Sequence, residues 1–345
     1  MKKIFFFLAG LLIAGNVSSY GKAKSDSDTL FTAFWNLENL FDTIDDPGKE
    51  DEEFTPNGAN EWTTERLDTK LNHLAQVINS MNKGNGPDVM GFSEVEHKAL
   101  IETMIDKYFN NKNYGIAYAE SPDARGIDVG LIYKKDKFRF LSVHTDTVVL
   151  PDKYPTRLIL NANIITTKND TLSLFINHWP SRRGGEEKSE INRVSAARVL
   201  RNHLDRIIAE NVNVKFIIMG DFNDQPSNKS IKEILCAAPV YCDSIEQIQK
   251  QGTVLNLAYR KHSVGEGSYF FSGKFEMIDQ IMVSGSLLTG KNISYICESF
   301  EVYKPSFMVE KSGRYKGSAN PTFGGKKYLG GYSDHFPVTA KFVIN

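Results

Sequence analysis

The sequence predicts an α/β protein in which mixed β-sheets carry helices on their outer faces. From residue 30 onward, short apolar runs alternate with amphipathic runs. The strand-like runs outnumber the helix-like runs, and several neighbouring strand-like runs have no helix between them. Successive parallel strands need a long crossover connection, so a mixed sheet system fits this order better than a strictly parallel sheet.

The predicted strands are apolar runs of ordinary strand length. They cover residues 30–35, 88–93, 127–133, 157–165, 172–178, 214–220, 274–283 and 336–343. Helices are predicted over residues 65–81, 98–108 and 186–210. In the first of these, apolar residues recur every three or four positions, and Thr63 or Thr64 can cap its start.

Composition narrows the class of protein. The chain has 345 residues, 41% hydrophobic and 24% charged, which is typical of a folded enzyme and excludes a disordered or fibrous protein. Its 41 Lys and Arg against 42 Asp and Glu give a formal net charge of −1. Proteins that coat nucleic acid through charge usually carry a basic excess, so this balance disfavours that class but not an enzyme that binds one phosphate locally.

The first residues predict an export signal. Lys2 and Lys3 precede an apolar run over residues 4–14, and small residues at 17–19 offer a cleavage site. The run is too short to span a bilayer comfortably, which favours a signal peptide over an uncleaved anchor. We expect residues 1–19 to be removed, residues 20–345 to form the mature protein, and that protein to be periplasmic or secreted without stable membrane insertion.

Three cysteines cannot all pair, so the chain is not a disulfide scaffold. An oxidising compartment permits one bridge, most simply Cys236 to Cys242, which would leave Cys297 unpaired. No Cys/His spacing predicts a zinc site.

Two segments between the predicted elements stand out. Residues 43–62 are acidic and are expected to form a solvated surface loop. Residues 304–332 are rich in Gly, Lys, Tyr and Ser, and are either a surface excursion or a flap beside the substrate.

Polar side chains follow or interrupt the predicted strands at several places. They are Asn36, Glu38, Glu94, His178, Asp221, Asn223, Asp279, Asp334 and His335. Strand ends from different parts of a sheet converge on one crevice, where α/β proteins build their sites. The set is rich in carboxylates and amides and has no Ser or Cys nucleophile arrangement. Hard oxygen ligands suit Mg²⁺, Mn²⁺ or Ca²⁺ better than zinc.

Arginines near these positions are candidate substrate contacts. Arg125 precedes the predicted strand 127–133, and Arg182 follows the His178 segment. Arginine suits bidentate phosphate contacts. Arg193 and Arg198 lie at helical spacing, which fits a solvated or packing face.

The ordered combination of these segments resembles the endonuclease/exonuclease/phosphatase superfamily, a group that includes pancreatic deoxyribonuclease, neutral sphingomyelinases and inositol polyphosphate 5-phosphatases. The resemblance rests on FWNLEN at 34–39, SE at 93–94, NHWPS at 177–181, GDFN at 220–223, MIDQ at 277–280 and SDHFPV at 333–338. It spans residues 30–345 and implies one catalytic domain. It also implies a four-layer sandwich, with two mixed β-sheets packed face to face and helices outside.

The resemblance also implies roles for the matching residues. Glu94 would be the main metal ligand, with Glu38 and Asp334 as further metal-ligating carboxylates and Asn36 beside them as a substrate contact. Asp221 would orient or deprotonate the attacking water, and Asn223 would hold the phosphate. Asp279 would fix the tautomer of His335, and His178 and His335 would face the phosphate oxygens. Whether Asp221 or His335 is the base stays open. Ser93 stands where many nuclease members carry Gln.

Three functions remain in competition. The first is an exported, Mg²⁺-dependent phosphodiesterase, a monomeric endonuclease or exonuclease with nucleic acid as its substrate. The second is a lipid or small-molecule phosphoesterase, like a sphingomyelinase or an inositol phosphatase, although the sequence shows neither an apolar membrane-contacting hairpin nor extended polyphosphate-binding signatures. The third is a catalytically silent binding module, which the presence of every expected polar position argues against.

Overall fold

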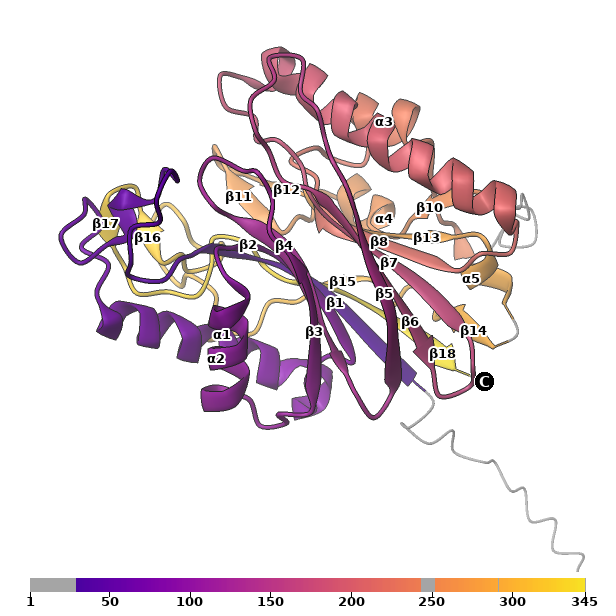
Figure 1. Cartoon of the computed structure of the whole chain (residues 1–345), viewed down its shortest axis with the longest axis horizontal. Helices are drawn as coiled ribbons and strands as arrows, with labels where there is room; N and C mark the ends of the chain where they lie inside the picture. Colours follow the sequence, from indigo (N-terminus) through magenta and orange to yellow (C-terminus); the bar gives the residue numbers. More distant parts are fainter. Residues whose placement is uncertain (1–28, 243–251, 291, 345) are drawn as a thin grey trace, which may run out of the picture.

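The computed structural model describes residues 29–242, 252–290 and 292–344, and two seven-stranded sheets form its centre (Figure 1). The first sheet has the order β14-β18-β1-β2-β4-β3, and β15 pairs with β18. Its strands are β14 (Ile293–Tyr295), β18 (Val338–Ile344), β1 (Thr29–Leu40), β2 (Val89–Val95), β4 (Asp128–Lys134), β3 (Tyr114–Ala119) and β15 (Glu301–Val302). β1 runs parallel to β2 and antiparallel to β18, so the sheet is mixed.

The second sheet has the order β5-β6-β7-β8-β13-β10-β9 and is also mixed. Its strands are β5 (Phe138–Asp146), β6 (Ile159–Thr166), β7 (Thr171–His178), β8 (Phe216–Asp221), β13 (Asp279–Ser284), β10 (Val254–Asn256) and β9 (Ala237–Pro239). Two small hairpins lie outside the sheets: β11 (Tyr269–Phe271) with β12 (Lys274–Glu276), and β16 (Phe323–Gly324) with β17 (Lys327–Tyr328).

Helices cover the outer faces of both sheets. In Figure 1, α1 (Thr64–Gly84) and α2 (Lys98–Tyr108) lie along the first sheet, and α3 (Glu186–Glu210) lies along the second. The short helices are η2 (Glu52–Phe54), η3 (Ser230–Ile234), α4 (Tyr259–Ser263) and α5 (Ser286–Thr289).

Three apolar clusters fill the spaces between these layers. The largest lies between the sheets and includes the fully buried Leu131, Leu174 and Ile217. A second joins α1 and α2 to the outer face of β1 and β2, and a third joins α3 to the outer face of β7 and β8. The predicted four-layer arrangement is therefore confirmed.

The helix predictions agree closely with the structure. The segments 98–108 and 186–210 are helical over those residues, and Thr63 caps α1 by accepting a hydrogen bond from the backbone N–H of Arg66. The predicted strand 274–283 is divided into β12 and β13. β3, β5 and the short strands β9, β10, β11, β14, β15, β16 and β17 were not predicted.

The predicted Cys236–Cys242 bridge is wrong. The disulfide joins Cys242 to Cys297, whose Cα atoms lie 5.9 Å apart, and the exposed Cys236 is free. The packing of the two sheets brings the distant positions together, since Cys242 follows β9 of the second sheet and Cys297 follows β14 of the first. The Cys236 thiol instead donates to the carbonyl oxygen of Glu233.

Replacing Cys297 by Ser should lower the free energy of unfolding by about 2–4 kcal/mol, because the bridge closes a long loop of the unfolded chain. The bridged residues are 55 positions apart in the sequence. Chemical denaturation of the oxidised protein measures the loss. Cys236→Ser is the matched control and should change nothing, and equal stability of Cys297→Ser and the parent would contradict a structural bridge.

The acidic segment 43–62 is not the fully solvated loop that its composition predicted. Phe54 and Trp62 are buried in a small cluster with Phe41 and Ile127, and Asp51 is 1% exposed. The segment 304–332 is tied to the end of β1, because the backbone N–H groups of Thr322 and Phe323 donate to the Glu38 carboxylate. That position favours the second of the two alternatives for this segment, because it lies beside the strand end that carries candidate site residues.

Across the described ranges, no helix has both the length and the apolar character needed to cross a membrane. The predicted signal peptide at residues 1–19 lies outside the described residues.

Candidate active site

Five strands place polar side chains at one edge of the two facing sheets. Cross-strand pairing sets His178 at the end of β7 beside Asp221 at the end of β8, and Asp221 opposite Asp279 at the start of β13. Asn36 on β1 pairs with Ser93 on β2, directly before Glu94. The predicted convergence of strand ends is therefore present in the fold.

Local irregularities in β1 and β2 turn the key side chains toward this edge. The β2–β4 register shifts between Ser93 and Val95, and Glu94 between them has a φ of 61°. The β1–β2 register shifts after Asn36, where Glu38 and Asn39 both have a φ of 50°. Bulges re-aim side chains, and left-handed backbone at residues other than Gly is strain that clusters at functional sites.

Asn36 links carboxylates from the two sheets. Its Nδ2 donates to Glu94 Oε1 at 3.2 Å and to Asp221 Oδ2 at 3.0 Å. The second Glu94 oxygen accepts from the backbone N–H of Asn39 at 2.9 Å. Burial alone would raise the pKa of Glu94, but His178 in its protonated form, the Arg125 charge and the Asn36 bond lower it to about 2. Glu94 is therefore an anion at neutral pH.

His178 lies on the other side of these carboxylates. Its Nε2 is 3.7 Å from Glu94 Oε1 and 3.9 Å from Asp221 Oδ2. Burial and the charge of Arg157 hold the pKa of His178 well below its usual range, so the ring is neutral. Its buried Nδ1 has no hydrogen-bond partner among the described residues.

His335 and Asp279 form a hydrogen-bonded dyad. His335 Nδ1 lies 2.7 Å from Asp279 Oδ2, which also accepts from the Ser268 hydroxyl at 2.6 Å. The other ring nitrogen lies 3.9 Å from Asp221 Oδ2. Burial opposes the charged ring, but the Asp279 and Asp334 carboxylates raise the pKa of His335 well above its usual range. One histidine of the site is thus neutral and the other cationic.

The remaining two carboxylates of the group have raised pKa values. Burial and the Asp279 charge raise the pKa of Asp221 to about 7. Partial burial raises that of Asp334 to about 7 as well; His335 opposes this shift, and the Glu38 and Glu94 carboxylates add to it. The Asp334 side chain is 39% exposed and its Oδ1 lies 3.9 Å from His335 Nε2, so it lies at the mouth of the group.

The amide and the two arginines predicted nearby border the group. Asn223 Nδ2 donates to the Trp179 carbonyl at 3.0 Å. Arg182 donates to the Asn223 carbonyl at 2.7 Å and pairs with Glu276 at 2.8 Å. Arg125 donates to the Asn39 side-chain oxygen.

Glu38, which was expected to bind the metal, accepts hydrogen bonds from a distant segment. One oxygen accepts from Thr322 N at 2.7 Å and the other from Phe323 N at 3.2 Å, and the buried Lys70 ammonium lies 3.5 Å away. Glu38 therefore anchors segment 304–332, and its role as a metal ligand stays a prediction.

Several residues of the site were not singled out from the sequence. Arg157 donates to the backbone carbonyls of His178 and Trp179 and pairs with Asp123 at 3.0 Å. Tyr269 stacks on the His335 ring with centroids 4.6 Å apart. Arg157 opens a predicted strand and Tyr269 lies in a short hairpin, so neither follows a strand in the way that marked the other candidates.

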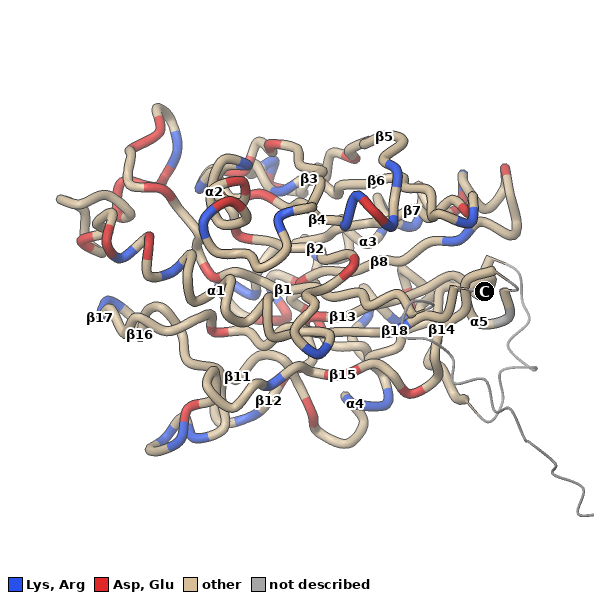
Figure 2. Tube along the Cα trace, turned by 90° about the horizontal axis from the view of Figure 1, so that it is seen from below, with Lys and Arg blue, Asp and Glu red and all other residues tan. Residues whose placement is uncertain are grey.

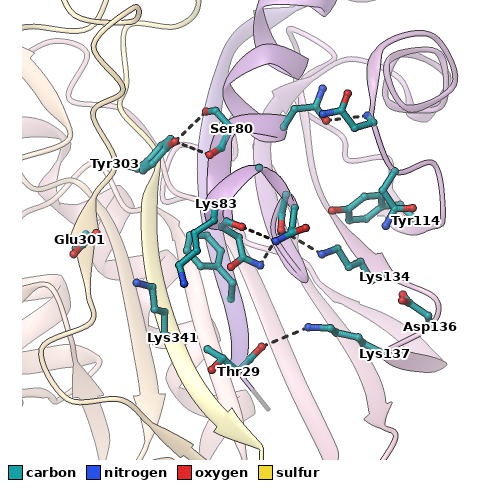
Figure 3. A pocket seen from close by; sticks show the side chains of 18 of the residues that line it. Thr29, Ser80, Lys83, Tyr114, Lys134, Asp136, Lys137, Glu301, Tyr303 and Lys341 are labelled. Carbon is teal, nitrogen blue, oxygen red and sulfur yellow. Dashed lines mark hydrogen bonds between the residues drawn. The ribbon is translucent and has the colours of Figure 1, made fainter. Parts of the chain in front are cut away.

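A cavity of about 780 Å³ lies at the opposite end of the first sheet from these residues (Figure 3). It is lined by Thr29 at the start of β1 and by Lys134 at the end of β4, whereas Asn36 and Glu94 lie at the far ends of β1 and β2. The Lys134 and Lys137 ammonium groups both pair with the buried Asp88 at 2.9 Å. This cavity is therefore separate from the candidate site.

Comparisons with known proteins agree with this fold. The sequence profile of the Endonuclease/Exonuclease/phosphatase family matches residues 31–343. No curated protein sequence matches the chain.

Solved structures share the whole architecture. The human Nocturnin catalytic domain with bound sulfate superposes with a TM-score of 0.55 at 13% identity, covering 92% of this chain and 94% of that one. The Bacteroides thetaiotaomicron mannosyl-6-phosphatase has a TM-score of 0.55 at 15% identity, covering 91% and 100%. D. rerio TDP2 complexed with single strand DNA product has a TM-score of 0.53 at 14% identity, covering 91% and 98%. At these identities the likeness shows the fold, and the profile match over nearly the whole chain shows the family. The chain therefore belongs to the endonuclease/exonuclease/phosphatase family of phosphoesterases.

Proposed function

We propose that the protein is an exported, divalent-metal-dependent phosphodiesterase that hydrolyses nucleic acid. The observation that carries the proposal is the meeting of Glu94, Asn36 and Asp221 from two sheets with one neutral and one cationic imidazole. Cleavage of a phosphodiester places negative charge on the phosphoryl and leaving oxygens, and these are the kinds of groups that stabilise it.

The donor set fits a hard cation. Glu94 stays ionised at neutral pH, and Asp334 offers a second carboxylate at the mouth of the group. Mg²⁺ keeps several waters and needs only one or two protein carboxylates, so we propose it as the cofactor, with Mn²⁺ or Ca²⁺ as substitutes. Such an ion supplies Lewis-acid stabilisation of phosphoryl oxygen charge.

The protein's own residues account for the rest of the chemistry. Asp221 lies between His178 and His335 at 3.9 Å from each, where it can orient an attacking water and accept its proton. His335 is held in one orientation by Asp279 and can donate from Nε2 to a phosphate oxygen. The Asn223 amide nitrogen keeps a second N–H beyond its bond to Trp179 and can donate it to the substrate.

Nucleic acid is the proposed substrate because every polar group of a phosphodiester-cleaving site is present, and because the similar D. rerio TDP2 is seen with a single strand DNA product. Acidic and basic residues are interspersed along the trace in Figure 2, and the formal net charge is −1. An extended basic surface strengthens the binding of a long polyanion such as nucleic acid, and a balanced charge does not favour such binding.

That charge balance favours a second candidate, a small phosphorylated molecule. Arg182, one of the two arginines expected to bind phosphate, is already paired with Glu276. A similar fold in the Bacteroides thetaiotaomicron mannosyl-6-phosphatase provides a precedent for a sugar phosphate.

Export is supported by the disulfide. Bridges such as Cys242–Cys297 persist in oxidising compartments and are rare in the cytosol. Fractionation of cells that express the full chain tests this part of the proposal, and retention in the cytosol with residues 1–19 attached would contradict it.

Purified protein should cleave plasmid DNA or RNA in the presence of Mg²⁺ and lose that activity in excess EDTA. Sphingomyelin, inositol phosphates and mannose 6-phosphate are incubated in parallel, with product release measured for each. Cleavage of nucleic acid that persists in EDTA would contradict the metal-dependent mechanism. Turnover of a small phosphoester without nucleic acid cleavage would establish the second candidate instead.

A further inference from the structure

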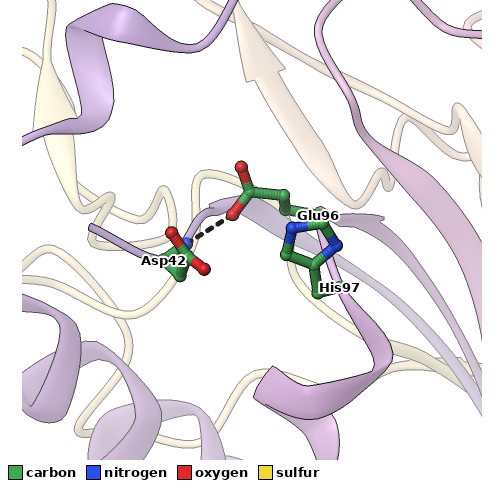
Figure 4. A group of neighbouring side chains, drawn as sticks. All are labelled: Asp42, Glu96 and His97. Atoms are coloured by element: carbon green, nitrogen blue, oxygen red, sulfur yellow. Dashed lines mark hydrogen bonds between the residues drawn. The ribbon is translucent and has the colours of Figure 1, made fainter. Parts of the chain in front are cut away.

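A second group of acidic side chains lies where the ends of β1 and β2 meet the segment 43–62. Ligand atoms of Asp46, Asp51 and Glu96 all lie within 4.8 Å of one another, and those of Asp42, Glu96 and His97 form an overlapping group. Figure 4 shows the Asp42 and Glu96 side chains facing each other beside the His97 ring. Glu96 belongs to both groups and is their centre.

Two of these carboxylates are almost fully removed from solvent. Asp51 is 1% exposed and Glu96 is 2% exposed. Phe41, directly before Asp42, and Phe54, three positions after Asp51, stack in an apolar cluster. Burying like charges beside apolar rings is costly unless an opposite charge or a full set of hydrogen bonds compensates them.

The described protein supplies only part of that compensation, since burial and the neighbouring Asp42 and Asp51 carboxylates raise the pKa of Glu96 to about 8. Across residues 29–242, 252–290 and 292–344, no Lys or Arg lies within ion-pair distance of these four carboxylates. Only His97 approaches, with its Nε2 at 3.0 Å from Asp46 Oδ2. Asp51 Oδ2 accepts the backbone N–H of Asp46 at 3.0 Å, but the buried Asp51 Oδ1 has no hydrogen-bond partner in the described part of the chain. A buried carboxylate oxygen without a partner, on a residue grouped with other carboxylates, is a feature that a bound cation explains.

We propose that Asp46, Asp51 and Glu96, with Asp42 beside them, form a Ca²⁺ site distinct from the candidate active site. All their donor atoms are hard oxygens, and Ca²⁺ accepts six to eight of these in irregular arrangements supplied by loops. Mg²⁺ demands near-octahedral geometry and fits a loop of this kind less well. The proposal does not depend on the proposed function, because none of these side chains belongs to the group around Glu94.

The site would brace the two strand ends that carry the candidate active site. Asp42 N donates to Glu96 Oε2 at 2.6 Å and Glu96 N donates to the Leu40 carbonyl at 3.0 Å, which joins the end of β1 to the end of β2. Asn39 and Glu94 lie just before these contacts on the same strands. An ion bound between Glu96 and Asp51 adds a third tie, from the strand ends to segment 43–62.

Calorimetric titration of CaCl₂ into chelator-stripped Glu94→Gln protein tests the proposal, because this background removes the main ligand of the active-site ion. We expect one Ca²⁺ per chain with a Kd between about 10⁻⁵ and 10⁻³ M, and weaker binding of Mg²⁺. Asp51→Asn and Asp46→Asn should each weaken Ca²⁺ binding at least about tenfold, since each removes one charged ligand. Asp45→Asn changes an exposed neighbouring carboxylate by the same atoms and should leave the Kd unchanged.

Thermal unfolding supplies a second readout. Saturating Ca²⁺ should raise the unfolding temperature of the Glu94→Gln protein, and this shift should vanish in Asp51→Asn. Without Ca²⁺, Asp51→Asn should be at least as stable as its parent, because the change removes repulsion. If Asp51→Asn does not fold, Asp46→Asn, at a side chain that is 31% exposed, still provides both measurements. Absence of Ca²⁺ binding in the Glu94→Gln protein, or an unchanged Kd in the Asp46 and Asp51 variants, would overturn the proposal and favour a shared proton between Asp51 and Glu96.

Discussion

Replacing His335 by Gln should lower the turnover of a phosphodiester substrate by about 10²–10⁴-fold, the range that a positioned proton donor or acceptor contributes. Its Nδ1 is committed to Asp279, so Nε2 is the nitrogen that faces Asp221 and the mouth of the group. Glutamine cannot carry the imidazolium charge that Asp279 and Asp334 stabilise in the parent. The initial rate at saturating substrate and Mg²⁺ measures the loss.

Asp279→Asn should also lower turnover, because the Asp279 carboxylate orients the His335 ring and stabilises its positive charge. If the two residues act as one unit, the double variant should be little slower than either single variant. Independent, multiplicative losses would separate Asp279 from the function of His335.

The control for both variants is His144→Gln, which changes an exposed histidine on the edge strand β5. It should leave turnover unchanged. The unfolding temperature of each variant shows whether the protein still folds. Loss of folding in both His335→Gln and Asp279→Asn, with turnover restored in the folded fraction, would assign the dyad to stability rather than to catalysis.

The group around Glu94 could be predicted from the sequence because several of its members lie at strand ends. Asn36, Glu94, His178 and Asp221 each stand at or directly after an apolar run, and the chain order of those runs suffices to predict one crevice. Glu38 also follows an apolar run, but its carboxylate accepts hydrogen bonds from segment 304–332. Its partners are backbone N–H groups more than 280 positions away, and residue type does not encode a contact of that kind.

The two longest strands that were missed share a physical cause. β3 and β5 each lie at the edge of a sheet, and most residues of β5 are exposed. Edge strands bury fewer side chains, so their apolar pattern is weak. The Cys242–Cys297 pairing likewise depends on how β9 and β14 are placed in space. Proximity in the sequence favoured the wrong pair.

Replacing Asp88 by Ala should lower the free energy of unfolding by about 3–5 kcal/mol, the cost of removing one partner from a buried ion pair. Asp88 is fully buried at the start of β2. Its Oδ1 pairs with the Lys134 and Lys137 ammonium groups at 2.9 Å, and its Oδ2 accepts the backbone N–H of Phe31 at 2.8 Å. The carboxylate therefore ties β1, β2 and β4 together, and its loss leaves a buried ammonium and a buried N–H without their acceptor.

Equilibrium denaturation of the purified variant measures this loss, with Asp136→Ala as the matched control. Asp136 lies two positions from Lys134 but is exposed, so its removal should change stability by less than about 0.5 kcal/mol. The double variant Asp88→Ala/Lys134→Met should recover part of the loss, because it removes the uncompensated buried charge as well. A double variant as unstable as the sum of its two single variants would show that lost packing, rather than the stranded ammonium, causes the effect. Since Asp88 lies at the end of β2 opposite Glu94, the folded fraction of Asp88→Ala should keep its turnover, which separates the stability of the sheet from the chemistry at its other end.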